Sequence, residues 1–166
     1  MYKTAIVTDT NSGLLPEEAE RLGIHLVPMP VIMDEENFFE YISITQADFF
    51  ARLKGGAAVS TSQPSPGALL SCWDALLETY DNLVYIPMSS SLSGEYQTAA
   101  MLAEDYDGRV HVADTHRISV TQRQAALDAL HWVQQEKSAA EIKAYLEHDG
   151  RNSDIFIAVN TLELLK

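Results

Sequence analysis

The alternation of short apolar runs with longer helical segments constrains the fold of this chain more than any other feature. The apolar runs are rich in β-branched residues and are expected to form strands at residues 3–8, 25–32, 82–87, 109–113 and 155–159. Pro28 and Pro30 interrupt the second of these strands. Strands that alternate with helices form a mostly parallel sheet with helices on both faces, so the sequence predicts an α/β fold.

Local end signals place the helices between these strands. Pro16 suits the first turn of a helix that stops at Gly23, and Thr45 with Asp48 has the spacing of a capping box. Ser65 before Pro66 marks another helix start. Together with the capping box after Ser138, these signals predict helices at residues 16–22, 45–53, 65–80, 95–103 and 138–147.

Charge and cysteine content argue against several classes of function. The chain has 11 lysines and arginines against 24 aspartates and glutamates, a formal charge of −13. Nucleic-acid binding and a stable polybasic membrane anchor both need clustered cations, so neither is expected. The single cysteine, Cys72, excludes an intrachain disulfide and suits a reducing compartment. Because the sequence also lacks a basic leader and an apolar run of about 20 residues, we expect a cytoplasmic protein.

Two hydroxyl-rich segments that precede predicted helices are the first candidates for a ligand site. They span residues 60–67 and 87–94, and loops at strand ends are where α/β sheets bind ligands. The hydroxyl of Ser93 could donate to an oxyanion, and Gly94 would let backbone N–H groups approach it. Glu95 would compete for the same helix dipole. The alternative is that Ser65 only caps its helix while the other hydroxyls face water.

A small serine hydrolase or phosphotransferase is the alternative function. A hydrolase elbow carries glycines two residues before and after its serine, whereas Ser93 has Ser91 and Glu95 at those positions. No histidine has an evident orienting partner, so we expect no catalytic residue.

Metal and nucleotide sites are also not expected. His111, Asp114 and His116 have a spacing that could suggest a metal, but His111 alternates with valines on a strand and would face away from the loop residues. Glycine-rich nucleotide motifs are absent, so no cofactor is predicted. Asp9 follows the first strand in a polar turn, where it could either lock the loop through an Asx turn or orient hydroxyls that bind a ligand.

Taken together, the motifs resemble the bacterial DegV family of fatty-acid-binding proteins. The segments that carry this resemblance span almost the whole chain: residues 8–13, Gly23-Ile24 followed by Pro28, residues 60–66, 89–97 and 159–163. The resemblance implies a non-catalytic protein that holds one long-chain fatty acid between two domains. It also implies that a separate fatty-acid kinase, acting for phospholipid synthesis, phosphorylates the carboxylate of the presented fatty acid.

The resemblance also implies which residues hold the ligand. Thr61 and Ser93 are expected to bind the carboxylate beside the backbone of Gly94, with support from a loop set of Asp9, Thr10, Ser62 and Ser90. The chain departs from the family at Thr10, where serine is commoner, and at Glu95, where a small or hydroxyl residue is commoner.

The last residues carry an expectation about domains. Residues 1–150 are predicted to form the DegV-like α/β domain, and residues 151–166 the start of a truncated second domain or a linking element. Asn160 can cap a helix that would expose Leu162, Leu164 and Leu165, and an isolated helix so short is marginal. If the second domain is absent, we expect weak fatty-acid binding and a homodimer formed through the uncovered face.

Overall fold

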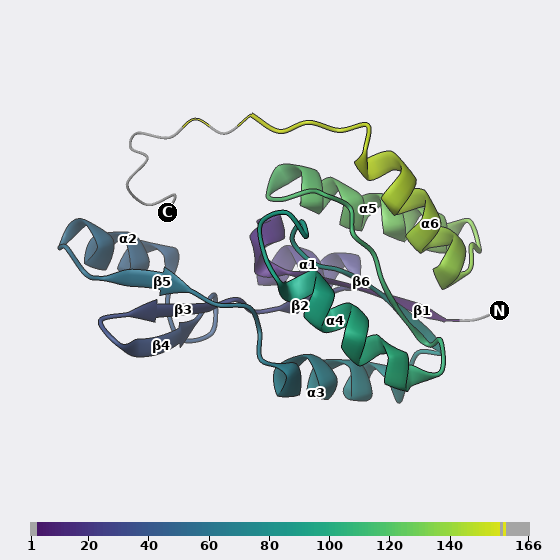
Figure 1. Ribbon diagram of the computed structural model, residues 1–166, viewed down its shortest axis with the longest axis horizontal. Helices are drawn as coiled ribbons and strands as arrows, with labels where there is room; N and C mark the ends of the chain where they lie inside the picture. The colour runs from purple at the N-terminus through teal and green to yellow at the C-terminus, as the bar shows by residue number, and fades with distance from the viewer. Residues whose placement is uncertain (1–2, 157, 159–166) are drawn as a thin grey trace.

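The computed structural model describes residues 3–156 and 158, which form a large body and a smaller lobe (Figure 1). The body contains a four-stranded sheet in the order β2-β1-β6-β7, and every pairing in it is parallel. Its strands are β1 (Thr4–Asp9), β2 (Ile24–Val27), β6 (Asn82–Ile86) and β7 (Val110–Val112). The predicted α/β fold is therefore confirmed.

Helices cover both faces of this sheet (Figure 1). One face packs against α1 (Pro16–Leu22), α5 (Val120–Gln134) and α6 (Ala139–Gly150), and the other against α3 (Pro66–Leu77) and α4 (Glu95–Ala103). A short 3₁₀ turn, η1 (Thr10–Ser12), follows β1, and a second, η2 (Glu104–Tyr106), follows α4.

The central strands alternate between the two hydrophobic cores. In β6, Val84 and Ile86 face the core beneath α5 and α6, whereas Leu83 and Tyr85 face the core beneath α3. Because successive side chains of a strand point to opposite faces, a strand buried on both sides is apolar throughout. This explains why the central strands are evident from composition alone.

The lobe is a three-stranded antiparallel sheet with one helix beside it. The sheet has the order β4-β3-β5, and its parts are β3 (Pro30–Met33), β4 (Glu36–Phe39), β5 (Val59–Thr61) and the helix α2 (Gln46–Lys54). Its hydrophobic core holds only three buried side chains, those of Val31, Met33 and Ile44. No residue of α2 is buried, so this helix lies largely in solvent.

The predicted end signals operate as expected in the body. Gly23 closes α1 in the left-handed region at φ 73°, and Ser138 and Glu141 form a reciprocal capping box at the start of α6. The hydroxyl of Ser65 accepts a hydrogen bond from the Ala68 amide at the start of α3. These caps depend on residues close in sequence, which is why the sequence reveals them.

Three predictions about the strands and helices are wrong or incomplete. The single strand expected at residues 25–32 is two strands in different sheets, separated at Pro28, because proline has no N–H to donate to a sheet. The strands β4 and β5 were not predicted, since both are short and largely exposed. Helix α5 was also missed. Its start lacks a capping signal, since Ser119 makes no side-chain cap bond.

The predicted last strand, residues 155–159, is wrong for the residues that can be checked. Residues 155, 156 and 158 lie in no regular structure, and Phe156 is 97% exposed. Residues 157 and 159, the predicted helix at 160–166 and the motif at 159–163 lie outside the described residues. The division at residue 150 stays a prediction.

Within the described chain, no helix is both long and apolar enough for a membrane span.

Candidate functional site

The carboxylate of Asp9 joins the loops that follow β1 and β6. It is fully buried, and it accepts hydrogen bonds from the Asn11 amide at 2.8 Å and from the Met88 amide at 2.7 Å. The first bond is the Asx turn predicted from sequence. Burial raises the pKa of Asp9 to about 6, although both amide bonds act in the opposite direction. Asp9 therefore holds the loops after β1 and β6 together.

Thr10 connects the body to the lobe. Its hydroxyl donates to a carboxylate oxygen of Glu40 and accepts a hydrogen bond from the Met29 amide at 3.0 Å. Both partners lie in the connections that enter and leave the strand pair of β3 and β4. Thr10 is buried, so it acts as a structural link and presents no free hydroxyl to a ligand.

The loop after β6 presents Ser93 and Gly94 at the start of α4. The hydroxyl oxygen of Ser93 accepts a hydrogen bond from the Glu95 amide at 3.1 Å. Among the described residues, the Ser93 hydroxyl donates to no acceptor, and the Gly94 amide is bonded to no partner. Both groups therefore remain available as donors to an acceptor from outside the chain.

Gln63 brings the segment that contains Thr61 to this helix end. Its amide nitrogen donates to the Thr98 hydroxyl of α4 at 3.0 Å. Its carbonyl oxygen lies 3.5 Å from the point where a Cβ on Gly94 would stand. Gln63 and Thr98 are 35 residues apart in the chain, so this hydrogen bond makes the segment of Thr61 a neighbour of the start of α4 in space.

Thr61 stands at the wall of a mainly apolar cavity of about 220 Å³. The cavity lies between the lobe and the loops that follow β1 and β6, and its apolar lining is Met29, Val31, Ile44, Phe49, Phe50 and Met88. Thr61 itself is exposed, and its hydroxyl makes no hydrogen bond to the described residues. A hydroxyl at the edge of an apolar cavity suits a ligand with a polar head and an apolar tail.

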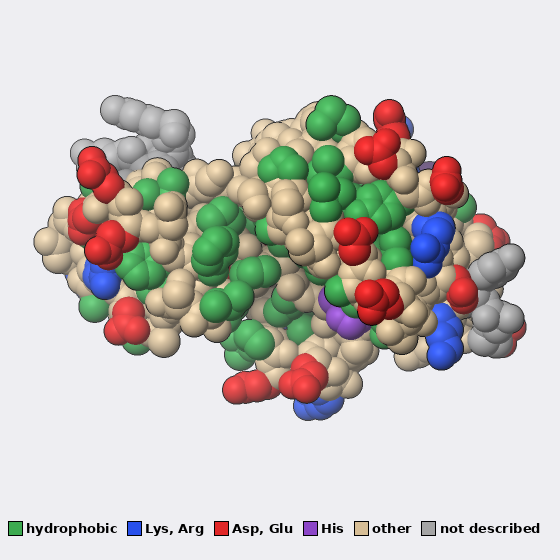
Figure 2. Space-filling model, turned by 90° about the horizontal axis from the view of Figure 1, so that it is seen from below, with side chains coloured by type: hydrophobic (Ala, Val, Ile, Leu, Met, Phe, Trp, Pro, Cys, Tyr) green, Lys and Arg blue, Asp and Glu red, His purple; other side chains and the backbone are tan. Residues whose placement is uncertain are grey.

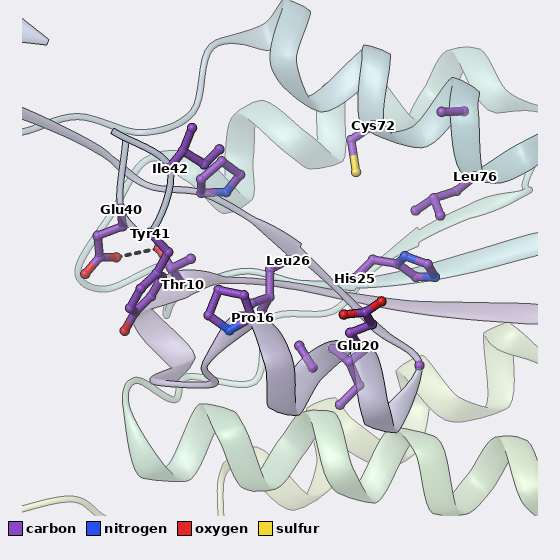
Figure 3. A pocket seen from close by; sticks show the side chains of 15 residues that line it. Thr10, Pro16, Glu20, His25, Leu26, Glu40, Tyr41, Ile42, Cys72 and Leu76 are labelled. Atoms are coloured by element: carbon purple, nitrogen blue, oxygen red, sulfur yellow. Dashed lines mark hydrogen bonds between the residues drawn. The ribbon is translucent and has the colours of Figure 1, made fainter. Parts of the chain in front are cut away.

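A second, larger cavity of about 560 Å³ runs along the edge strand β2 between α1 and α3 (Figure 3). Leu26 and His25 come from β2, Pro16 and Glu20 from α1, and Cys72 from α3. Figure 2 shows hydrophobic side chains gathered between the lobe and the body on the face seen there. Glu40 and Tyr41 line both cavities, but neither Thr61 nor Ser93 lines this one.

Glu95 differs from its sequence-based description. Its side chain is fully buried, and one carboxyl oxygen is hydrogen bonded to the Tyr85 hydroxyl. Burial, together with the nearby charge of Asp9, raises the pKa of Glu95 to about 8. At neutral pH the side chain is therefore largely uncharged, so the predicted competition for the helix dipole is much reduced.

The remaining residues of the predicted support set, Ser90 and Ser62, are bonded to other parts of the backbone and side chains. Ser90 donates its amide to Asp114 at 3.3 Å, so it ties the loop after β6 to the loop after β7. Ser62 is exposed, and its hydroxyl donates only to the backbone of Gln63 at 3.2 Å. Ser90 therefore supports the loop after β6, whereas among the described residues Ser62 has no hydrogen bond to that loop.

Sequence reasoning missed the buried cation that secures these loops. Arg117 is 6% exposed, and its backbone carbonyl accepts the Ser89 amide at 2.9 Å. Its guanidinium pairs with Asp149 at 3.2 Å and donates to the Ser153 hydroxyl at 2.8 Å. Because these partners are up to 36 residues away in sequence, no local pattern reveals the role of Arg117.

The spacing of His111, Asp114 and His116 forms no shared centre. His111 lies on β7, whereas the Nδ1 atom of His116 is 3.5 Å from a carboxylate oxygen of Asp114. Across residues 3–156 and 158, no three histidine, cysteine, aspartate or glutamate side chains gather as metal ligands.

Comparisons with known proteins agree with this architecture. A family model described as "Uncharacterised protein, DegV family" matches residues 3–166. A DegV domain-containing protein of Deinococcus radiodurans is 31% identical over 98% of this chain and 58% of its own length. A DegV domain-containing 15.5 kDa protein of Staphylococcus aureus is 31% identical over 72% of this chain and 85% of its own length.

Two solved structures resemble this chain closely in fold. The structure described as fatty-acid binding of a DegV family protein from Thermus thermophilus has a TM-score of 0.81 and 31% identity. It matches 90% of this chain, which corresponds to 54% of the Thermus chain. DegV from Bacillus subtilis, described as a fatty acid binding protein, has a TM-score of 0.81 and 28% identity over 91% of this chain and 55% of its own. The chain thus spans little more than half of these proteins.

Proposed function

The chain belongs to the DegV family, and from this membership we propose that it supplies the carboxylate-binding part of a fatty-acid-binding protein. In this proposal, Thr61, Ser93 and the Gly94 amide hold the fatty-acid carboxylate. The acyl tail extends over the apolar lining of the adjacent cavity.

The observation that carries the proposal is the placement of Thr61 at the wall of an apolar cavity, in a segment that meets the start of α4. Gln63 holds the segment of Thr61 next to the start of α4, where the Ser93 hydroxyl and Gly94 amide have no described acceptor. A carboxylate that leaves water needs several donors, because an unpaired buried charge is strongly unfavourable. Two hydroxyls and an amide at a helix start are suited to that need.

The apolar cavity supports a lipid over a small polar metabolite. Burial of an acyl chain contributes about 0.8 kcal/mol per methylene, so the tail supplies most of the affinity and the head group fixes the orientation. Cavities for whole ligands usually measure about 300–1,000 Å³. The cavity of about 220 Å³ beside Thr61 therefore accommodates only part of a long tail. The Thermus and Bacillus relatives described as fatty-acid-binding give independent support.

We further propose that the protein does no chemistry itself and acts with a fatty-acid kinase. In that reaction the γ-phosphoryl group of ATP is transferred to a carboxylate oxygen of the bound fatty acid, which yields an acyl phosphate and ADP. The donors at Thr61 and Ser93 would position the carboxylate for the kinase. The serine hydrolase remains the alternative. A hydrolase would need a base that accepts the proton of the Ser93 hydroxyl, and within the described residues the hydroxyl oxygen only accepts a hydrogen bond, from the Glu95 amide.

Fatty-acid binding is tested by titration of the isotope-labelled chain with octanoate, followed by NMR. We expect the amide signals of residues 93–95 to shift. Thr61→Val and Ser93→Ala should each weaken binding about 10- to 100-fold, because each removes one donor from a desolvated carboxylate. Ser60→Ala is the matched control, since adjacent strand residues face opposite sides of β5.

Two results would count against the proposal. The site is wrongly assigned if octanoate shifts no signal near residues 93–95. It is also wrongly assigned if the double variant, Thr61→Val with Ser93→Ala, binds as well as the wild type. Turnover of a simple ester that disappears in Ser93→Ala would favour the hydrolase instead.

A further inference from the structure

We propose that Glu95 is a positioning residue of the carboxylate site that must be neutral for an anionic ligand to bind, so that its ionisation releases the ligand. This inference rests on the proposed function, and it concerns how the same site is regulated. It follows from the position of Glu95, the lack of a cation beside it in the described part of the chain, and the incomplete hydrogen bonding of its carboxyl group.

Glu95 is joined directly to the proposed donors. It follows Gly94 in the chain as the first residue of α4, and its amide donates to the Ser93 hydroxyl oxygen at 3.1 Å. The side chain turns inward, with 0% of the residue exposed. One carboxyl oxygen meets the Tyr85 hydroxyl, and the other is buried without a hydrogen-bond partner among the described residues. A buried carboxyl group with so few donors disfavours the charged form.

The titratable groups around Glu95 do not offset a negative charge. The charge of Asp9 on β1 raises the pKa of Glu95, whereas the hydrogen bond with Tyr85 on β6 lowers it. Cys72 of α3 in turn raises the pKa of Tyr85. β7 presents the apolar side chains of Val110 and Val112 to this core. Asp74 of α3 is bonded to the exposed hydroxyl of Tyr106. None of these groups is a cation, so ionised Glu95 would have no ion-pair partner.

A bound carboxylate at Ser93 and Gly94 would place a further negative charge beside this residue. Like charges that share a desolvated site cannot readily coexist, so the ligand binds the protonated form of Glu95. Burial raises the pKa of Glu95 to about 8. Affinity for a carboxylate should therefore be steady up to about pH 7 and fall above pH 8, because the competent protonated form is depleted.

The test compares octanoate affinity at pH 7 and pH 9 by NMR titration of the whole 166-residue chain. Both values lie above the pKa of about 6 for Asp9, so Asp9 stays ionised throughout. We expect wild-type affinity to fall about tenfold between them. In Glu95→Gln, which keeps the neutral shape, the two affinities should agree within about twofold. Octanol, which has no charge, should show no such dependence with either chain.

Two variants separate this role from a general effect on folding. Glu104→Gln removes an exposed carboxylate at the far end of α4 and should keep the wild-type pH profile. Tyr85→Phe removes the hydroxyl whose hydrogen bond lowers the pKa of Glu95, so the loss of affinity should move to higher pH. Circular dichroism at both pH values verifies that each variant is folded.

The outcomes distinguish the two proposals. Octanoate binding with equal affinity at pH 7 and pH 9 would overturn the role of Glu95 while leaving the fatty-acid site intact. A tenfold loss that persists in Glu95→Gln would also overturn it. Absence of binding near residues 93–95 at every pH would instead refute the proposed function.

Discussion

The body and the lobe of this protein are stabilised to very different extents. The body has two hydrophobic cores, one on each face of its parallel sheet, and in β6 four of the five residues are buried. The lobe has three buried side chains in its core, and its helix α2 has none. Because stability depends on the apolar area buried, most of the folding free energy must come from the body.

The difference assigns separate tasks to the two regions. Ser93 and Gly94 lie on loops of the body, which are fixed by the buried Asp9 and Arg117. Thr61 lies at the end of a short exposed strand of the lobe, beside the apolar cavity. Weakly packed elements open locally at low free-energy cost. Under the proposed function, the lobe would adjust around an acyl tail while the body keeps Ser93 and Gly94 in place.

The largest expected effect comes from truncation of one buried residue in each region. Leu83→Ala in the body should lower the free energy of unfolding by about 3–5 kcal/mol, because it leaves a cavity that close-packed neighbours cannot fill. Met33→Ala in the lobe should cost about 2 kcal/mol, since a small core can collapse around the gap. Denaturant melts measure both values, and hydrogen exchange should show faster exchange confined to β3, β4 and β5 for Met33→Ala. Equal costs with uniform exchange would mean that body and lobe unfold as one unit.

A smaller effect is expected when the free energy of unfolding is measured against pH, because the strongly buried carboxyl groups lie in the body. Burial raises the pKa of Asp9 from 3.8 to about 6 and that of Glu95 from 4.5 to about 8. Between these values the folded state holds protons that the unfolded chain has lost, so stability falls as pH rises. From pH 6.5 to 7.5, where Glu95 dominates, the free energy of unfolding should drop by about 1 kcal/mol.

Glu95→Gln should remove most of this slope in denaturant melts, because glutamine does not titrate. Glu36→Gln, which alters an exposed carboxylate of the lobe, is the control and should preserve it. A wild-type stability that rises over this pH interval would contradict the burial of a neutral Glu95.

The smallest expected effect concerns the turn between β3 and β4. Met33 pairs with Glu36, and the two residues between them, Asp34 and Glu35, have φ values of 49° and 70°. A two-residue turn with positive φ at both positions favours glycine at the second. Glu35→Gly should therefore stabilise the lobe by about 0.5 kcal/mol, measured as slower amide exchange in β3 and β4. Glu36→Gly, placed in the strand β4 itself, should destabilise the lobe instead.

Local patterns in the sequence determined the frame of the body. The apolar central strands, the glycine stop after α1 and the capping box at Ser138 each depend on residues that are close together in the chain. The same patterns located the hydroxyl-rich loops, because polar residues that follow an apolar strand are visible as such. In the lobe, the cap at Thr45 predicted α2, but β4 and β5 were missed, since a short, largely exposed strand leaves no clear period.

Only the tertiary structure decided how the candidate site is assembled and charged. Gln63 meets Thr98, and Arg117 meets Asp149, through contacts that no spacing in the sequence specifies. The sequence places Glu95 at a helix start, where a carboxylate would ordinarily be ionised and favourable. The fold instead buries it beside Tyr85 and near the charge of Asp9, and this burial raises its pKa to about 8. Desolvation is a property of everything packed around a group, so the charge of that residue could not be determined from its neighbours in the chain.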